Sequence, residues 1–352
     1  MTGPAVRCRR RAVGRVPGHS PGRAAAVAAA AAIALLAGCS GATAGSQGAD
    51  DSGAVAADAT APFAVDQDFP DPDVLNNGGT YYAYATNGNG FNVQVATSPD
   101  LETWEVLGTD ALPILPSWST PGRTWAPEVT EVSPGAFVMY LTATATAAQA
   151  QCIGVATASD PAGPFSPLGD DPIVCPDAQG GAIDASIFRD DDGSLHLLWK
   201  NDGNCCGLDT FLQIAPLTAE GTALAGDSVR LLRQDLPWEG NLIEAPTLIK
   251  HDDAYVLFYS ANDYGGDKYA TGYATSPTLL GEYTKAREPV LTTETSGGRY
   301  LGPGGQDIVE APDGSDAIVF HSWDELYIQR GMNVAPLTWN DGVPSVTVPG
   351  PR

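Results

Sequence analysis

Positively charged residues are scarce in this sequence. Its 352 residues include 18 Lys and Arg against 42 Asp and Glu, which gives a formal net charge of -24 at pH 7. Binding to nucleic acid or to an anionic membrane surface depends on clustered Lys and Arg. The composition therefore argues against both as partners, and it suits a soluble secreted protein that acts on neutral or cationic material.

A helical pattern of apolar residues is also missing. No useful window shows the 3.6-residue period of an amphipathic helix, so an α/β fold is not expected. Charged residues make up only 17% of the chain, whereas 40 Gly, 28 Pro and 28 aromatic residues (7 Trp, 12 Tyr, 9 Phe) are present. This mixture is typical of many short strands joined by tight turns. We therefore expect an all-β fold.

The apolar run near the N-terminus is too short to span a bilayer. It covers the 14 residues from Ala24 to Ala37 and follows an Arg-rich segment, whereas a transmembrane helix needs about 20. Residues 1–38 are therefore predicted to be a signal peptide. The run ends in Leu36-Ala37-Gly38-Cys39, which resembles a bacterial lipobox and implies lipidation of Cys39; an ordinary signal peptide with an incidental Cys39 is the alternative.

The segment that follows has almost no large apolar residues. Residues 39–61 consist largely of Ser, Gly, Ala, Thr and Asp, so they cannot form a core and are predicted to be a flexible tether. The expected location is extracellular, with contact to the membrane only through the lipid anchor.

Cysteines are few. Of the six, Cys8 lies in the predicted signal peptide and Cys39 at the lipidation site, which leaves four in an exported domain where disulfides can form. Their spacing matches no zinc-site pattern. We expect Cys152 to pair with Cys175, because both flank one predicted strand pair. The partners of the adjacent Cys205 and Cys206 stay open.

Short strands recur in a fixed order after the tether. The third strands of the repeats are similar to one another, as in Val95-Ala96-Thr97-Ser98 and Tyr273-Ala274-Thr275-Ser276. The polar residues that open the repeats are spaced by 57 (71 to 128), 56 (128 to 184), 60 (184 to 244) and 62 (244 to 306) residues. A regular period of four-stranded units is typical of a β-propeller. We predict one five-bladed β-propeller over residues 62–352; a two-sheet sandwich has no reason to show this period.

The opening residues of the repeats are mostly acidic. The first strand of each blade lines the channel of a propeller, so we expect the following side chains to converge at one end: Asp71, Glu128, Asp184, Glu244, and Gln306 or Asp307. Crowded and poorly hydrated carboxylates have raised pKa values. One group can then donate a proton while another remains a base. The alternative is that these acids cap turns and stay solvated.

The opening motifs resemble those of glycoside hydrolase family 43. The resemblance runs through all five repeats and includes Asp71-Pro72-Asp73-Val74, Trp125-Ala126-Pro127-Glu128, Ile183-Asp184-Ala185-Ser186 and Glu244-Ala245-Pro246. It implies a propeller that hydrolyses arabinose- and xylose-containing plant polysaccharides with inversion. By motif, Asp71 would be the general base, Glu244 the general acid, and Asp184 the residue that orients the acid and tunes its pKa. Glu239 is a competing candidate for the acid.

One motif departs from the family pattern. Many members carry a His in the frame Gly-Pro-Gly-His, associated with a channel metal that is often calcium, whereas this sequence has Gly302-Pro303-Gly304-Gly305. We therefore expect no required cofactor and assign no metal ligands, with calcium as the alternative.

Several residues are candidates for binding a carbohydrate substrate. Aromatic faces suit the apolar faces of sugars and planar donors suit hydroxyl groups, which selects Trp125, Glu128, Gln306, His321 and Arg330. Core packing of Trp125 and a structural role for His321 are the alternatives. The expected protein is a monomeric α-L-arabinofuranosidase or β-xylosidase. An endo-1,5-α-L-arabinanase and a non-catalytic glycan-binding lipoprotein are the other functions considered. A retaining invertase-like enzyme would open with Asn-Asp-Pro-Asn, which is absent around Asp71.

Overall fold

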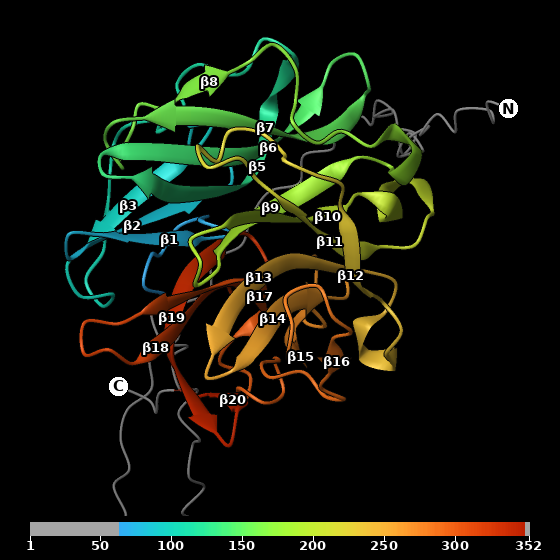
Figure 1. The fold of residues 1–352 in the computed structure, drawn as a ribbon. Coiled ribbons are helices and arrows are strands. Elements are labelled where there is room, and N and C mark those ends of the chain that lie inside the picture. The colour runs from blue at the N-terminus through green and yellow to red at the C-terminus, as the bar shows by residue number, and fades with distance from the viewer. Residues whose placement is uncertain (1–62, 349–352) are drawn as a thin grey trace, which may run out of the picture. The chain divides into compact units, whose positions relative to one another are not determined.

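The strands form five sheets of four antiparallel strands each, arranged as a ring (Figure 1). The computed structural model describes residues 63–348, so the predicted signal peptide, the tether and Cys39 lie outside the described residues. Each sheet contains four strands that follow one another along the chain. The predicted five-bladed β-propeller is thereby confirmed.

The blades are named here in chain order. Blade 1 contains β1 (Asp73–Asn77), β2 (Thr80–Ala85), β3 (Gln94–Ser98) and β4 (Glu105–Val106). Blade 2 contains β5 (Ser119–Ser133), β6 (Ala136–Ala145), β7 (Ala150–Ala158) and β8 (Ser166–Leu168). Blade 3 contains β9 (Ala182–Arg189), β10 (Leu195–Asn201), β11 (Phe211–Pro216) and β12 (Val229–Arg233).

The last two blades have the same order. Blade 4 contains β13 (Ile243–His251), β14 (Ala254–Ala261), β15 (Ala270–Ser276) and β16 (Thr284–Lys285). Blade 5 contains β17 (Leu301–Glu310), β18 (Asp316–Trp323), β19 (Arg330–Asn340) and β20 (Val343–Val346). Three short 3-10 helices lie between strands: η1 (Asp177–Gln179), η2 (Gly203–Cys206) and η3 (Pro237–Glu239). None of the helices in residues 63–348 has the length and hydropathy that crossing a bilayer would require.

The hydrophobic core lies between neighbouring blades. One cluster joins Tyr84 and Val95 of blade 1 to Val129 and Met139 of blade 2, and all four side chains are buried. The second strand of a blade is covered on both faces, which accounts for the nearly continuous apolar run in β6. The blades are therefore held in place by face-to-face packing, which fixes where their inner strands meet.

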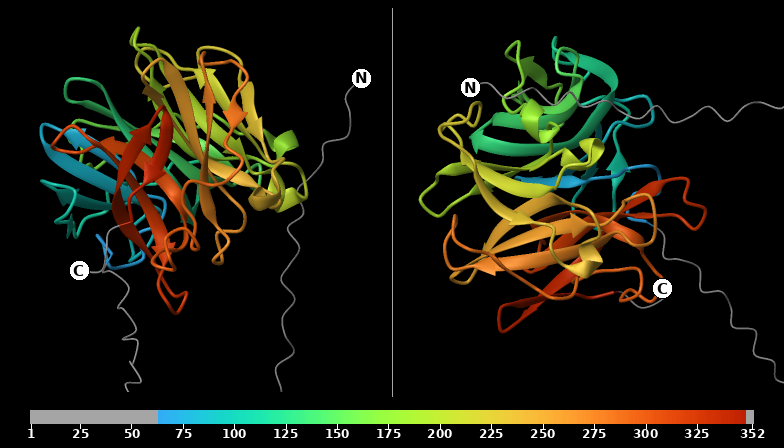
Figure 2. Two further views of the ribbon diagram at one scale, coloured as in Figure 1. Left: turned by 90° about the horizontal axis from the view of Figure 1, so that it is seen from below. Right: turned by 90° about the vertical axis from the view of Figure 1, so that its right-hand side faces the viewer.

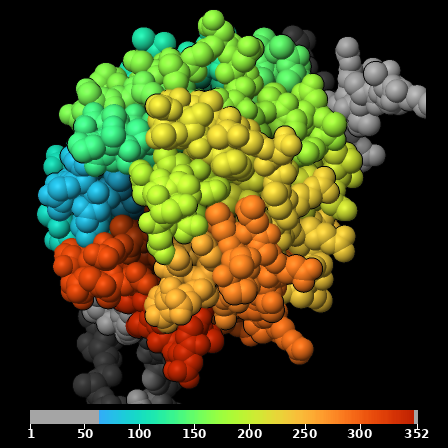
Figure 3. All heavy atoms as spheres, viewed as in Figure 1, coloured from blue at the N-terminus to red at the C-terminus, as the bar shows by residue number. Residues whose placement is uncertain are grey.

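The ring is closed by the first described residues. Val65 forms a β-bridge with Met332 of β19, and the Ala64 N–H donates to the Met332 carbonyl at 2.8 Å. The other end of β19 pairs with β20. The N-terminal segment thus adds to the last blade, and the first blade (blue) lies against the last (red) in both the ribbon and the space-filling view (Figures 1 and 3).

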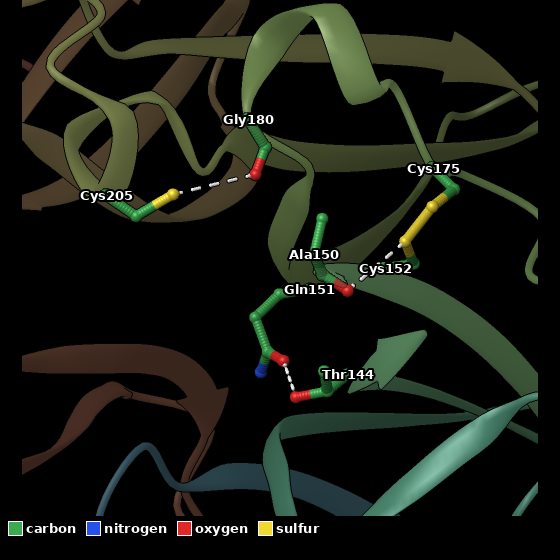
Figure 4. The surroundings of a disulfide bond; sticks show 7 residues. All are labelled: Thr144, Ala150, Gln151, Cys152, Cys175, Gly180 and Cys205. Carbon is green, nitrogen blue, oxygen red and sulfur yellow. Dashed lines mark hydrogen bonds between the residues drawn. A yellow bond between two sulfur atoms is a disulfide. The ribbon is translucent and has the colours of Figure 1, made fainter. Parts of the chain in front are cut away.

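A disulfide joins Cys152 of β7 to Cys175, the pairing expected from the sequence (Figure 4). Next to it, Ile153 and Val174 form an isolated β-bridge, so the segment before η1 is held against β7 by a covalent bond and by backbone hydrogen bonds. Cys205 lies in η2, where its Sγ is 3.8 Å from the Gly180 carbonyl oxygen. These contacts hold the segment between blades 2 and 3, and the two further views show the blades in green and yellow, which this segment joins, side by side (Figure 2).

Candidate active site

The five inner strands share an unusual backbone feature. At one equivalent position in each blade the residue has a left-handed conformation, with φ between 38° and 57°: Asp71, Ala126, Asp184, Ala245 and Gly305. In blades 2 to 5 a β-bulge in the pairing of the inner strand spans this position. This backbone conformation is energetically unfavourable for residues other than glycine. Its presence at four non-glycine positions of the five therefore shows that the surrounding structure imposes it.

The backbone N–H of each left-handed residue is held by a side chain of the preceding blade. The acceptors are His321 Nδ1 for Asp71 (3.1 Å), Thr86 Oγ1 for Ala126 (2.9 Å), Thr142 Oγ1 for Asp184 (3.3 Å), Asp184 Oδ2 for Ala245 (3.0 Å) and Ser260 Oγ for Gly305 (2.9 Å). At each bulge the backbone N–H has no partner on the neighbouring strand. The side-chain acceptors provide the hydrogen bonds that these buried N–H groups need. They also fix the direction in which the carboxylates of Asp71 and Asp184 leave the backbone.

The carboxylates form two tiers, defined by their positions along the inner strands. The upper tier contains Asp71 and Asp184 at the left-handed positions, with Glu244 one residue before Ala245. The lower tier lies two residues further along the strands and contains Asp73, Glu128 and Asp307. Asp71 and Asp184 line one channel between the inner strands together with the lower tier, and Glu244 directly precedes Ala245 in its lining. The residues whose intervals were counted in the sequence occupy four positions relative to the left-handed residue: the same position for Asp71 and Asp184, one before it for Glu244, one after it for Gln306 and two after it for Glu128.

Asp71 is surrounded by groups that favour its ionised form. Its Oδ2 accepts a hydrogen bond from Thr86 Oγ1 at 2.7 Å, and its Oδ1 lies 3.8 Å from Arg330 Nη1. Burial opposes ionisation, but the Arg330 guanidinium and the hydrogen bond from Thr86 hold the pKa of Asp71 well below its ordinary value. About a quarter of this side chain is exposed (24%). Asp71 is therefore a charged carboxylate that a bound molecule can reach.

Glu244 lies between a lysine and a tyrosine. Lys200 Nζ is 2.8 Å from Glu244 Oε2, and Tyr269 Oη donates to Oε1 at 2.9 Å. Lys200 is almost fully buried, with 1% of its side chain exposed, whereas 11% of the Glu244 side chain is exposed. The lysine thus neutralises the carboxylate from inside the wall, while part of the Glu244 side chain stays accessible.

Asp184 shares this environment. Burial and the nearby Glu244 carboxylate raise the pKa of Asp184 well above its ordinary value, and Lys200 acts in the opposite direction. Its Oδ2 also accepts the Ala245 N–H, which fixes the backbone next to Glu244. Asp184, whose pKa is raised, is therefore held next to Glu244, while Asp71 on another blade stays ionised. A donor and an acceptor of protons are thus separated in one site.

Sequence reasoning missed three residues of this site. Lys200, Tyr269 and Thr86 belong to second or third strands or their ends, whereas the analysis followed only the first strand of each blade. A signal was present for Lys200, because it is the one cation in the otherwise apolar stretch Leu195-His196-Leu197-Leu198-Trp199-Lys200. A buried lysine needs a carboxylate partner. Nothing in the sequence distinguishes Tyr269 or Thr86 from other residues at strand ends.

The lower tier ties the blades together. Asp73 accepts the Val129 N–H at 2.8 Å, Glu128 the Ile187 N–H at 2.8 Å, and Asp307 the Val74 N–H at 2.9 Å. Each carboxylate thus binds the backbone of the following blade. A hydrogen bond to a charged group contributes about 1.5–3 kcal/mol to the stability of the fold. Burial raises the pKa of Asp307 to about 6, and burial together with the neighbouring acids raises the pKa of Asp73 and Glu128. These groups retain protons more readily than surface acids.

The predicted substrate-binding residues lie at different depths. Glu128 belongs to the lower tier. Gln306 is buried and its amide is engaged, since Oε1 accepts from Ser260 Oγ and Nε2 donates to the Ala245 carbonyl, each at 2.7 Å. His321 is fully buried and stacks on Tyr269 with ring centroids 5.7 Å apart. These three hold the wall in place. Trp125, half-buried beside Ala126, and Arg330 are the members of the set that retain exposed surface near Asp71.

His321 holds the backbone of Asp71 in position. Its Nδ1 lies 3.1 Å from the Asp71 backbone nitrogen, which can only donate, so Nδ1 is an acceptor and the imidazole is neutral. Burial lowers the pKa of His321. His321 is thus a positioning residue, in line with the structural alternative considered from the sequence.

Glu239, the competing candidate for the acid, lies away from the channel. Its Oε2 accepts the N–H groups of Asp235 and Leu236, and its Oε1 is 2.7 Å from both Tyr259 Oη and Lys285 Nζ. The side chain is fully buried in η3 and both oxygens are engaged. Glu239 therefore anchors a loop, whereas Glu244 keeps 11% of its side chain exposed and directly precedes the channel residue Ala245.

The residues present do not fit the channel metal that the family resemblance suggests. A Cβ at Gly305 would lie 2.7 Å from His321 Nδ1 and 2.8 Å from Asp71 Oδ1, so the wall has no room for an imidazole at this position. Within residues 63–348, no group of three or more His, Cys, Asp or Glu side chains is arranged to hold a metal ion. We therefore derive no step through a metal.

Replacing Lys200 with Met is expected to shift the pH dependence of the reaction. The ammonium stabilises the ionised forms of Glu244 and Asp184, so its loss should move the alkaline limb of the kcat/KM profile to higher pH by roughly 1–3 units. The profile is measured between pH 4 and 10. Lys200→Arg keeps the charge and should keep the wild-type limb.

A second lysine provides the control. Lys250 forms an ion pair with the exposed Asp191 on the surface, and Lys250→Met should leave the profile unchanged because surface ion pairs contribute little. An alkaline limb that stays at its wild-type position in Lys200→Met would show that the lysine only supports the fold.

Comparison with known proteins points to one family. Residues 61–344 match the model of the glycosyl hydrolases family 43. A probable arabinan endo-1,5-alpha-L-arabinosidase A from Aspergillus flavus is 30% identical over 75% of this chain and 76% of its own length. An extracellular exo-alpha-(1->5)-L-arabinofuranosidase, ArbA, from Cellvibrio japonicus is 26% identical over 79% of this chain and 86% of its own length. The crystal structure of a thermostable family-43 glycoside hydrolase superposes with a TM-score of 0.71 at 29% identity, covering 81% of this chain and 96% of that one.

Proposed function

The chain belongs to family 43 of the glycosyl hydrolases and is therefore a glycosidase; on this premise we propose that it cleaves α-L-arabinofuranosides or β-xylosides with inversion. The observation that carries the proposal is the pairing, in one channel, of an ionised Asp71 with a separate Asp184–Glu244 pair. Inversion requires a carboxylate that activates water on one face of the sugar and a carboxylic acid that protonates the leaving oxygen on the other.

Each residue has a distinct task in the proposed reaction. Asp71 accepts a proton from the attacking water, Glu244 donates a proton to the glycosidic oxygen, and Asp184 orients Glu244 through the Ala245 backbone. Arg330 keeps Asp71 ionised and lies where it can also donate to sugar hydroxyls. Lys200 and Tyr269 hold the Glu244 carboxylate from inside the wall.

An endo-1,5-α-L-arabinanase is the second candidate. The relative with 30% identity bears this activity in its name, and the same carboxylates would perform the hydrolysis. The two candidates differ in whether the substrate enters by its end or lies across the mouth of the channel.

A substrate screen with product analysis tests the proposal. Nitrophenyl α-L-arabinofuranoside, β-D-xyloside and galactoside are assayed beside linear arabinan and arabinoxylan. We expect turnover of an arabinofuranoside or a xyloside, and proton NMR should show the inverted anomer as the first sugar released. Release of the retained anomer would overturn the assignment of Asp71 as the base. Internal cleavage of arabinan with little release of monosaccharide would favour the second candidate.

Removal of divalent metal ions is expected to leave the rate unchanged. Gly305 takes the place of the family's histidine and its surroundings admit no larger side chain, so the proposed reaction uses only protein groups. The measurement compares kcat/KM before and after dialysis against a chelator. A loss of rate that added calcium restores would contradict this prediction.

We also propose that the protein is extracellular and anchored through a lipid on Cys39, which rests on the lipobox-like stretch at residues 36–39. Labelling of producing cells with a radioactive fatty acid tests this: wild-type protein should carry the label and Cys39→Ser should lack it. An unlabelled wild-type protein would refute the anchor.

A further inference from the structure

Two loops beside the candidate active site expose aromatic side chains. Tyr264 lies in the loop between β14 and β15, Trp323 is the last residue of β18, and Tyr327 lies in the loop that leads to β19. We call these three residues the aromatic rim. Tyr264 and Tyr327 are exposed by 50% and 42%, and the adjoining Ile328 is exposed by 73%. Exposed apolar patches of this kind mark binding surfaces more often than isolated exposed residues do.

The aromatic rim is an ordered structure. Trp323 Nε1 donates to the Tyr264 carbonyl at 2.7 Å, which ties the two loops together. The rings of Trp323 and Tyr327 lie with centroids 5.9 Å apart. Asp324 holds the intervening loop through the N–H of Ile328 at 2.6 Å. The rings are therefore presented in a defined arrangement, which lowers the entropic cost of binding a ligand on them.

Arg330 connects the aromatic rim to the candidate base. Its Cζ lies 5.0 Å from the ring centroid of Tyr264 and 5.7 Å from that of Trp323, at cation–π distance. Its Nη1 is 3.8 Å from Asp71 Oδ1. One side chain thus contacts both the rings and the carboxylate, so the rim is continuous with the candidate active site.

Strand register places the aromatic rim beyond the upper tier of the channel. Along β18, Val319 pairs with the lower-tier Asp307, His321 with Gly304 beside the upper tier, and Trp323 with Leu301 beyond it. Asp71 in the upper tier has 24% of its side chain exposed, and Arg330 beside it has 15% exposed. The rim therefore lies beyond the upper tier, on the side of the partly exposed Asp71.

The second loop reaches the candidate acid. β14 carries Ser260, which binds the Gly305 N–H, and ends one residue later at Ala261. The chain then passes through Tyr264 and returns by Tyr269, whose hydroxyl binds Glu244. The loop that carries Tyr264 of the rim thus leads directly to Tyr269, which binds the candidate acid.

We propose that the aromatic rim is a second sugar-binding subsite, which holds the saccharide unit that extends out of the channel from the bond being cleaved. This inference rests on the proposed function, since it takes the occupant to be a further unit of the same glycan. Flat aromatic faces suit the apolar faces of sugar rings, and Arg330 supplies donors for hydroxyl groups next to them. Because the protein carries a net charge of -24, an uncharged glycan is a suitable ligand for such a surface.

The test compares a short and a long substrate. In Tyr264→Ala and in Trp323→Ala, kcat/KM for an arabino- or xylo-trisaccharide should fall about tenfold more than kcat/KM for the matching nitrophenyl monosaccharide. The control is Leu280→Ala. Leu280 is also exposed (54%), but it follows β15 at the end where Ser276 pairs with Tyr255, away from the channel opening. The control should affect neither substrate.

Binding provides the second measurement. Titration calorimetry of the trisaccharide against Glu244→Gln and against Glu244→Gln/Tyr264→Ala should show about tenfold weaker binding by the double variant. Equal losses on the short and long substrates, or no loss on either, would overturn the inference. If wild type cleaves none of the glycosides in the screen, the proposed function fails. Trisaccharide binding by wild type that Tyr264→Ala abolishes would still support the aromatic rim.

Discussion

Replacement of Asp71 with Asn is expected to lower kcat/KM for the preferred nitrophenyl glycoside at least about 100-fold. The amide has the size of the carboxylate and can still accept from Thr86 Oγ1, so the wall of the channel should be retained. It cannot take a proton from water, because a neutral amide is a negligible base. The loss should appear in kcat, because Asp71 activates the attacking water in the transition state and contributes less to binding of the sugar.

The pH profile of wild type adds to this test. Because Arg330 and its neighbours hold the pKa of Asp71 below its ordinary value of about 3.9, the base should remain ionised down to mildly acidic pH, and the acidic limb should begin below pH 4. Asp170→Asn, at an exposed position after β8, is the matched control and should keep wild-type rates. Wild-type kinetics in Asp71→Asn would show that another group activates water.

Replacement of Glu244 with Gln should have an effect that depends on the leaving group. With an oligosaccharide, whose leaving oxygen needs a proton, kcat should fall at least about 100-fold. With a dinitrophenyl glycoside the departing phenolate is already stable, so the loss should be much smaller. A glutamine also removes the charge that Lys200 neutralises, so a loss of thermal stability is expected in addition. The contrast between the two substrates isolates the role of the proton from this change in stability.

Glu105→Gln is the control for this variant. Glu105 lies in the exposed outer strand β4, and its replacement should change neither substrate. Equal losses on the oligosaccharide and the dinitrophenyl glycoside would show that Glu244 supports the site without donating a proton. In that case Asp184, whose pKa is raised, would be the remaining candidate for the acid.

The number of blades could be predicted from the sequence because each blade buries its faces against two neighbours. This requirement repeats the same apolar strands at nearly constant intervals, as in β3 and β15, and the repeat survives divergence of individual residues. The segment that closes the ring could not be predicted in the same way. Ala64 and Val65 join the last blade through backbone hydrogen bonds to Met332, and backbone pairing leaves little trace in residue types.

The site was harder to predict than the fold. Asp71 and Asp184 were found because acidic residues at the start of inner strands are visible in the sequence. They lie in another tier than Glu128 because of the left-handed conformation at each bulge. Glycine usually marks this conformation in a sequence, but Ala126 and Ala245 adopt it here. Lys200 was missed because its role arises from a neighbouring blade, 44 residues away in sequence. Contacts between blades are set by packing, which single-strand motifs do not encode.

The way the ring closes has a consequence for engineering. Val65, near the start of the described chain, and Val343–Val346, near its end, both pair with β19, so the two ends meet on one strand. A short linker between them, with new termini cut at the exposed turn Asp191-Asp192-Gly193, would give a circular permutant in which every strand pair is retained. The channel and its carboxylates would then be carried by a chain whose ends lie on a different blade.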